Sequence, residues 1–152
     1  MTIASIIASK VAALGATGKK EVRTVKPDST VAEAIRRMRD ERVGGLVVSE
    51  DGTNILGMVS DRGIVDALAD HGLDVLKDLV RSVMVHEVVT CSADDRVGTV
   101  MAAMVARGIR HIPVIDDERR LRGLVSMSDL VKYQLQEIQA EADAMRMYIS
   151  GG

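Results

Sequence analysis

Ser126 and Asp129 are the two side chains whose types and spacing are best suited to chemistry. They stand three residues apart in the run GLVSMSDLV, where a β-rich segment gives way to a helix-forming one. At such a junction both side chains face the free N–H groups of the first helical turn, whose partial positive charge attracts a phosphate. Gly123, just before them, lets a backbone group approach closely. The run therefore predicts an anion-binding point at the start of the last helix.

The same spacing also has a purely structural interpretation. Ser-x-x-Asp is close to a capping box, in which the two side chains hydrogen-bond to the backbone N–H groups that begin a helix. From these residues alone both interpretations stay open, and the serine can serve both roles.

A related run, GMVSDRGIV, occurs earlier in the chain. It keeps Ser60 but has Gly63 where the later run has Asp129. Asp61 is adjacent but points about 100° away on a helix, so we do not expect it to replace the missing carboxylate. Arg62 is either a phosphate ligand or a solvated cation. We therefore expect the first run to make the weaker site.

Both runs belong to a long internal repeat. The segments that begin at Val22 and Val88 run in register without a gap, at a constant offset of 88 − 22 = 66 positions. Met38 matches Met104 at this offset, and Ser60 matches Ser126. This self-similarity indicates a tandem duplication. The two copies must then bury their apolar faces against each other about a pseudo-twofold axis.

Each copy predicts the order strand, helix, strand, strand, helix, so the fold class is α+β. The first copy predicts strands over 22–25, 45–49 and 55–59, a helix over 31–38 and a second helix from Ser60. The second copy predicts strands over 88–91, 111–115 and 121–125, a helix over 97–104, and a long helix from Ser126 that ends before Gly151.

The repeat also predicts the organisation of the whole chain. We expect a short N-terminal helix and lead-in over 1–21, a first repeat over 22–72, a connection over 73–87, and a second repeat with an extended C-terminal helix over 88–149. The first segment has apolar residues at helical spacing, but Lys10 interrupts them, and no stretch reaches the roughly 18 residues of a membrane span. We expect no membrane partner.

Composition excludes several functions. A net charge of −2 provides no basic field for nucleic acid. The three histidines lack the spacing of metal ligands, and the acidic run 116–118 is typical of a solvated hairpin tip. No arrangement of His, Asp and Ser indicates nucleophilic catalysis. The single cysteine, Cys91, matches Val25 and predicts a buried strand residue in a cytoplasmic protein. We therefore expect neither an enzyme nor a metal protein.

The paired units resemble a tandem pair of cystathionine-β-synthase (CBS) domains, the arrangement called a Bateman module. The resemblance rests on TVKPDSTVAEAIRRM, VGGLVVSEDGTNILGMVSDRGIV, GIRHIPVID and RLRGLVSMSDLV, and it extends from about Val22 to the end. It is greatest with small bacterial proteins that consist of one such pair. The resemblance implies two packed α/β sheets, a homodimer, and clefts between the repeats that bind AMP, ADP, ATP or NAD.

The resemblance also implies site residues. In the family, the equivalent of Asp129 accepts hydrogen bonds from ribose hydroxyls, and the serine reaches the phosphate. The cleft of Ser126, Asp129 and Gly123 would be lined by residues of the first repeat, namely Thr24, Lys26, Pro27, Val43, Gly44, Gly45 and Leu46. A second, weaker cleft would contain Ser60, Arg62, Arg110, His111 and Ile112.

The leading functional hypothesis is therefore a regulatory adenine-nucleotide sensor that has no catalytic cofactor and acts in trans through an unidentified protein partner. A homodimer is expected, because an aliphatic, Met-rich composition leaves apolar helix faces for a second chain to cover. The alternative is a ligand-free structural dimerisation protein that uses its C-terminal helix.

Overall fold

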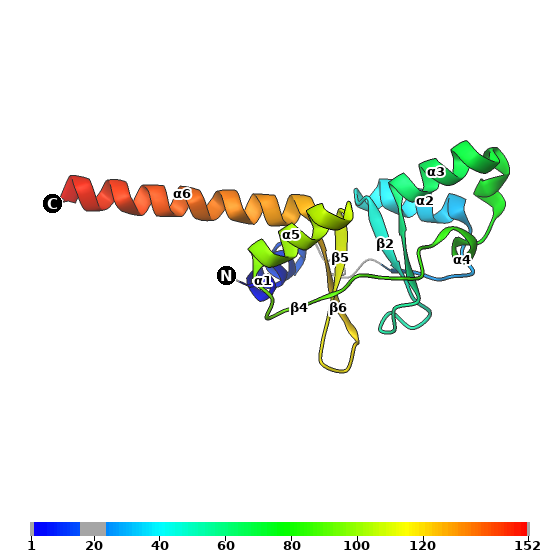
Figure 1. The fold of residues 1–152 in the computed structure, drawn as a ribbon, viewed down its shortest axis with the longest axis horizontal. Coiled ribbons are helices and arrows are strands. Elements are labelled where there is room, and N and C mark those ends of the chain that lie inside the picture. Colours follow the sequence, from blue (N-terminus) through cyan, green and yellow to red (C-terminus); the bar gives the residue numbers. More distant parts are fainter. Residues whose placement is uncertain (1, 16–23, 152) are drawn as a thin grey trace.

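The computed structural model describes residues 2–15 and 24–151 (Figure 1). The first repeat consists of β1 (Thr24–Val25), α2 (Val31–Glu41), β2 (Gly45–Val48), β3 (Gly57–Ser60) and α3 (Asp61–His71). The second consists of β4 (Cys91–Ser92), α5 (Val97–Arg107), β5 (His111–Ile115), β6 (Leu121–Ser126) and α6 (Met127–Gly151). The α+β class and the order strand, helix, strand, strand, helix are confirmed.

The two three-stranded sheets have the same topology and register. Their strand orders are β1-β2-β3 and β4-β5-β6, with the first pair parallel and the second antiparallel. Gly45 lies opposite Ser60 in one sheet, and His111 lies opposite Ser126 in the other. These four positions are related by the offset of 66, so the sequence repeat is also a repeat of hydrogen bonding.

Local sequence explains where the helices begin and end. Thr30 and Glu33 form a reciprocal capping box at the start of α2, and Arg42 ends that helix in the left-handed conformation. Gly108 ends α5 in the same conformation, which glycine adopts without steric cost. Buried positions of α2 and α5 follow helical spacing, at Val31, Ala34 and Met38, and at Val97, Val100 and Met104.

Several details differ from the sequence-based expectation, including the strand predicted over 55–59, which lies at Gly57–Ser60. The strand predicted over 88–91 lies at Cys91–Ser92, because residues 88–90 line cavities between the repeats instead of joining the sheet. The connection contains two elements that were not predicted, a 3-10 helix η1 (Leu73–Lys77) and α4 (Val80–Val83). The helix α6 continues through Gly151. Val22 lies outside the described residues.

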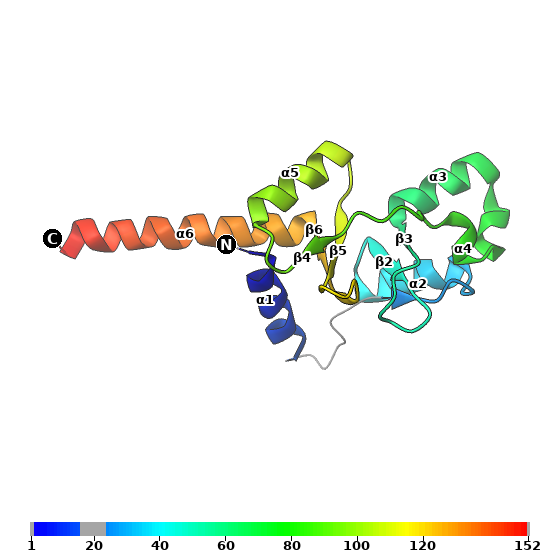
Figure 2. The ribbon, with the colours of Figure 1, turned by 60° about the horizontal axis from the view of Figure 1, so that its bottom comes forward.

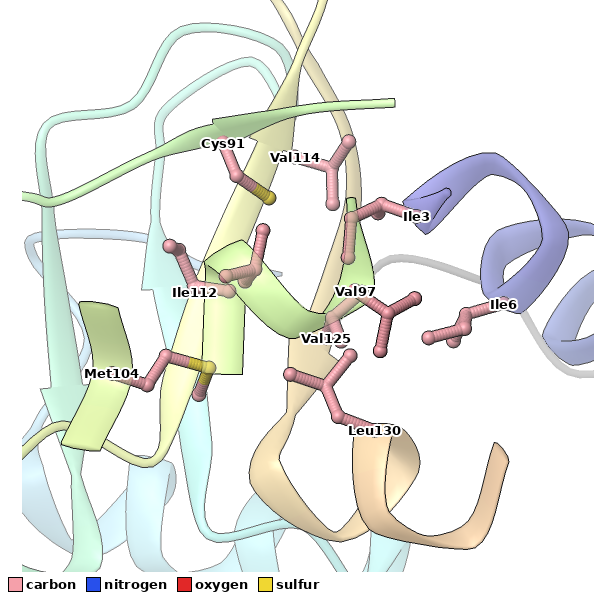
Figure 3. Close-up of a cluster of buried hydrophobic side chains, with 10 residues drawn as sticks. Ile3, Ile6, Cys91, Val97, Met104, Ile112, Val114, Val125 and Leu130 are labelled. Carbon is pink, nitrogen blue, oxygen red and sulfur yellow. The ribbon is translucent and has the colours of Figure 1, made fainter. Parts of the chain in front are cut away.

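Each repeat has its own core, and each core is completed by the segment that precedes the other repeat. Ile3 and Ile6 of α1 (Ile3–Gly15) join the core of the second repeat (Figure 3). Val75 of η1 and Val80 of α4 join the core of the first repeat. All four side chains are at most 3% exposed. The two repeats are therefore interlocked, and neither has a complete core without residues from outside it.

Cys91 lies in the second core, as expected. Burial, with a smaller contribution from Asp95, raises the pKa of its thiol to about 12, so the thiol stays protonated at neutral pH. Its role is that of a small apolar side chain.

A third apolar cluster joins the two sheets. Val47, Leu121 and Leu124 are buried together, with Ile55 and Met58 packed against them. The Leu121 N–H also donates to the Thr53 carbonyl across the repeats, at 2.8 Å. The two hairpins lie side by side in both ribbon views (Figures 1 and 2). Among the described residues, no helix is both long and apolar enough to cross a membrane.

Gly57 marks the tightest backbone approach around the first sheet. The neighbouring Met58 exchanges two backbone hydrogen bonds with Val85, at 3.0 and 2.8 Å. A Cβ atom at Gly57 would lie 2.7 Å from the Val85 carbonyl oxygen and 2.8 Å from the Met84 sulfur. The connection before the second repeat is thus fastened to β3 only because residue 57 lacks a side chain.

We expect Gly57→Ala to lower the free energy of unfolding by about 1 to 3 kcal/mol, because the backbone must shift to admit the methyl group. Gly98→Ala is the matched control. Its Cβ would meet nothing within 4 Å, so the change should be neutral or stabilise α5 by up to about 1 kcal/mol. Denaturant unfolding measures both variants. Equal stability of the two would contradict the proposed close approach.

Candidate functional site

A cavity of about 150 Å³ lies between the repeats, where β3 meets α3. Its apolar lining residues are Met58, Val85, Val88, Val89 and Ile109, accompanied by the backbone of Gly108. Its polar lining residues are Ser60, Arg62, Glu87, Arg110 and His111. The first repeat, the connection and the second repeat all contribute, so the cavity exists only when the repeats are packed together.

Ser60 stands where β3 ends and α3 begins. Its hydroxyl oxygen accepts a hydrogen bond from the Gly63 N–H at 3.1 Å, which caps the helix. The hydroxyl can still donate its own proton. The first turn of α3 therefore brings a hydroxyl, helical N–H groups and the Arg62 side chain to one corner of the cavity, a combination suited to an anion.

Arg110 lies beside this corner and pairs with Asp61. Its Nη2 atom is 2.8 Å from Asp61 Oδ1, and both side chains are more than half exposed. An exposed pair of this kind contributes at most about 1 kcal/mol. An incoming phosphate can therefore compete with Asp61 for the guanidinium at little cost.

His111 lies next to Arg110 and is packed against two glycines of β2 and its preceding turn. A Cβ at Gly45 would be 3.0 Å from Cγ and Nδ1 of the imidazole, and one at Gly44 would be 3.2 Å from its Cε1. Burial, and then the charge of Arg110, lowers the pKa of His111. The ring is therefore neutral at neutral pH and presents both a donor and an acceptor.

Asp129 lies in a different environment. It forms the capping box with Ser126: its carboxylate accepts the Ser126 N–H at 2.9 Å, and the Ser126 hydroxyl oxygen accepts the Asp129 N–H at 3.1 Å. The carboxylate also binds the Lys10 ammonium group at 2.8 Å, and that group donates to the Leu124 carbonyl at 2.6 Å. A cavity of about 110 Å³ between α1 and α6 adjoins this pair.

The electrostatics of Asp129 reflect these contacts. Burial raises the pKa of the carboxyl group, but the hydrogen bonds from Lys10 and Ser126 and the charge of Lys10 outweigh it, so the net pKa is lowered. Asp129 is thus an ionised carboxylate whose present partner is an ammonium group of the chain itself. In the sequence, Lys10 is an interruption of an apolar helix face, and that interruption is the available signal for a partly buried charge partner.

The structure brings together one of the two predicted sets of residues. Ser60, Arg62, Arg110 and His111 surround the 150 Å³ cavity, whereas the Ile112 side chain is buried in the second core. For the other predicted cleft, the cavity of about 110 Å³ beside Asp129 is lined by residues of α1 and α6 and by none of the first-repeat residues predicted to face that carboxylate. The other residues predicted for this cleft, which occur mostly in the first repeat, are Thr24, Lys26, Pro27, Val43, Gly44, Gly45, Leu46 and Gly123.

These other residues have varied surroundings. Leu46 is fully buried and Val43 partly buried in the first core, so their backbone groups alone can face a ligand. The Thr24 carbonyl accepts from Arg37, and the Pro27 carbonyl accepts from the Arg81 N–H. Gly123 is buried in β6 opposite Val114, and Lys26 is exposed.

Several residues around the cavity were not predicted. Glu87 and the valines at 85, 88 and 89 belong to the connection or to the segment just before β4. Their nearness to the second repeat in sequence was the only signal that could have pointed to them. Among the described residues, no group of three or more His, Cys, Asp or Glu side chains could hold a metal ion. At the hairpin tip, Asp116 instead accepts hydrogen bonds from Arg120 and Arg122.

These features define the class of the protein as a pair of α+β repeats, related by a pseudo-twofold axis, with a polar-ended cavity between them. The chain belongs to the CBS domain family, whose model matches it twice, at residues 17–70 and 80–136. It is 32% identical over 126 residues to an uncharacterised 17.7 kDa protein of Acidianus ambivalens, covering 83% of this chain and 73% of that protein. The chain spans 62% of the length of another curated relative.

Solved structures share the architecture. A CBS-domain containing protein from Agrobacterium tumefaciens superimposes with a TM-score of 0.78 at 28% identity, over 88% of this chain and 92% of that one. A CBS domain protein from Pyrobaculum aerophilum, solved in complex with AMP, superimposes with a TM-score of 0.70 at 21% identity, over 85% and 89%. The tandem pair of CBS domains is thereby confirmed.

The ion pair between Lys10 and Asp129 leads to a prediction about stability. In a double-mutant cycle of Lys10→Met and Asp129→Asn, we expect a coupling energy of about 1 kcal/mol at pH 7, because each side chain is less than one-third exposed. The folded-state pKa of Asp129 is lowered, so this contribution is present above about pH 4 and is lost as the pH falls through the folded pKa.

Denaturant unfolding between about pH 3 and pH 7 measures the coupling. Lys132→Met is the control, because Lys132 lines the same small cavity but is not the partner of Asp129 in the ion pair. A coupling energy that does not change with pH would show that the pair contributes no charge interaction to the fold.

Proposed function

We propose that this CBS pair is a regulatory module that binds an adenine nucleotide, namely AMP, ADP, ATP or NAD, and acts in trans on a protein partner without catalysis. The observation that carries the proposal is the cavity between the repeats, which joins an apolar slot to a helix N-terminus and two arginines. The AMP bound to the Pyrobaculum aerophilum protein supports this class of ligand.

The apolar part of the cavity suits a planar base. Met58, Val85 and Ile109 supply aliphatic walls, and the chain has no Phe or Trp on which a base could stack. A volume of about 150 Å³ is below the roughly 300 to 1,000 Å³ of clefts that enclose whole ligands. The base therefore enters the cavity, and the sugar and phosphate stay at its mouth.

The polar part suits the phosphate. Ser60 can donate a hydrogen bond, Arg62 is exposed in the first turn of α3, and Arg110 is held only by an exposed ion pair. Charge-assisted hydrogen bonds from such groups are stronger than neutral ones. The carboxylate that would accept the ribose hydroxyls is missing, because Gly63 occupies its place.

The cleft of Asp129, predicted from the sequence as the main nucleotide site, stays a proposed site. Lys10 and the Ser126 N–H both bind Asp129 Oδ2, so a ribose hydroxyl that takes this oxygen displaces the ammonium group and releases part of the contact between α1 and α6. Occupancy of this site would then change the packing of the N-terminal helix, which is a physical route from ligand to partner.

We expect Arg62→Ala and Arg110→Ala each to weaken AMP binding by about 1 to 3 kcal/mol, because each removes a charged donor at the phosphate end. Arg36→Ala is the matched control, since Arg36 lies on α2 and does not line the cavity. Isothermal titration calorimetry of AMP measures all three. If the control loses as much affinity as the cavity variants, the assignment of this cavity is wrong.

A thermal-stability panel of AMP, ADP, ATP and NAD tests the function itself. A ligand that binds only the folded state stabilises it by RT ln(1 + [L]/Kd), or about 2.7 kcal/mol at 100 times Kd. Stabilisation by none of the four would reject the nucleotide sensor and favour the ligand-free dimerisation protein, for which the exposed apolar residues of α6 are the supporting observation.

We expect Gly63→Asp to tighten AMP binding about tenfold or more, because it supplies the carboxylate that Asp129 provides in the second repeat. A Cβ at residue 63 would lie 3.3 Å from Ser60 Oγ, so only a small shift of the serine is needed. Gly63→Ala adds the same Cβ without the carboxylate and is the control. Calorimetry should show the gain only for aspartate, and an equal gain for alanine would exclude a ribose contact.

A further inference from the structure

The helix α6 carries apolar side chains that none of the described residues covers. Its start is anchored by Leu130, which is fully buried, and by Tyr133, which packs against the second core, and its C-terminal part projects beyond the body of the molecule (Figures 1 and 2). Leu135 is 61% exposed, Ile138 57%, Met145 68% and Ile149 76%. A helix that is polar on one face and apolar on the other normally gains its stability by packing the apolar face against another element.

The spacing of these residues is that of a coiled coil. The apolar positions of the stripe advance in steps of four and three, at Val131, Leu135, Ile138, Ala142, Met145 and Ile149. This alternation is a repeat of 3.5 residues, in which Leu135, Ala142 and Ile149 take the a positions and Val131, Ile138 and Met145 take the d positions. A stripe of this kind is a seam for a second helix with the same repeat.

We propose that α6 pairs with α6 of a second copy of this chain, in parallel and in register, to form a short coiled coil. A second copy is the partner that supplies the same repeat with the same length and the same order of side chains. The stripe starts at Val131, immediately after the buried Leu130, and continues beyond Tyr133, which still packs against the second core.

Charges beside the seam fix the direction. In a parallel pair, a g residue faces the e residue five positions further along the other helix. Glu141 is at g and Arg146 is at e, so Glu141 faces the partner's Arg146, and the twofold axis makes this contact twice. Arg146 lies only at 3.9 Å from Asp143 within its own helix and is 78% exposed, so it is available for this contact.

The antiparallel pair is disfavoured by the same residues. Full overlap of the two stripes would place Glu141 beside the partner's Glu141, because g faces g in that arrangement. It would also place Lys132 beside the partner's Arg146, because e faces e. Both contacts are between like charges and disfavour the arrangement.

Disulfide cross-linking tests both the partner and the direction. The chain has a single cysteine, Cys91, which is buried, so an introduced cysteine on α6 reports on its own position. In Ala142→Cys, a parallel in-register pair places the two thiols at the same a position, with Cβ atoms close to the roughly 4 Å that a disulfide needs. In Ala140→Cys the thiol lies about 200° away around the helix and faces solvent.

Under mild oxidation, we expect Ala142→Cys to form a disulfide-linked dimer at least about tenfold faster than Ala140→Cys, because the latter must wait for chance collisions. Non-reducing gel electrophoresis measures both rates. Equal rates would overturn the proposal, and so would a wild-type chain that sediments as a monomer at tens of micromolar.

Charge reversal provides an independent measurement. We expect Glu141→Arg and Arg146→Glu each to slow the cross-linking of Ala142→Cys, and the two together to restore it, because the pair is then reversed but still complementary. Ala140→Arg, at an outward f position, should leave the rate unchanged. Failure of the double reversal to restore cross-linking would contradict the parallel arrangement. None of these measurements depends on nucleotide, so their outcome is separate from that of the proposed function.

Discussion

The structure depends on one packing constraint: each repeat obtains part of its core from the segment that precedes the other. Ile3 and Ile6 complete the second core, and Val75 and Val80 complete the first. Burying a side chain of this size contributes about 1.5 to 3 kcal/mol relative to exposure. The repeats therefore fold as a single interlocked unit, and the cavity between them keeps its shape because its two walls are held from both sides.

The duplicated sequence has diverged where it could bind a ligand. One strand-to-helix junction has Ser60 with Gly63 and opens onto a cavity with Arg62 and Arg110. The other has Ser126 with Asp129, and its carboxylate is held by Lys10. The copy that lacks the carboxylate opens onto the cavity between the repeats, whereas the carboxylate of the other copy binds a lysine of the chain itself. The two repeats thus have the same backbone topology but different polar side chains at their strand-to-helix junctions.

The sequence predicted the features that occur in both repeats and those that depend on residues close together in the chain. The offset of 66 residues predicted both sheets, and the spacing of apolar residues predicted α2, α5 and α6. It did not predict the contact between Lys10 and Asp129, since 119 positions separate the two residues and periodicity says nothing about how elements meet. It assigned Gly44 and Gly45 to the cleft of Asp129, and both lie against His111, whose electrostatic surroundings include Asp129 and Lys10. Gly45 and His111 are equivalent positions, so their contact follows from the pseudo-twofold axis, whose location is a property of the packing and not of either repeat.

The junction at Ser126 begins a long helix, so a small rotation at this junction moves the far end of α6 by a much larger distance. The 25 residues of α6 span about 37 Å, and the helix packs on the body near its start, through Leu130 and Tyr133. A reorientation of its first turn by about 5° would carry the far end through about 3 Å, which is close to the scale of one residue step along a strand. Lys10 and Asp129 form their ion pair at the base of this helix. A small rearrangement of that pair would therefore produce a larger displacement at the C-terminal end of α6.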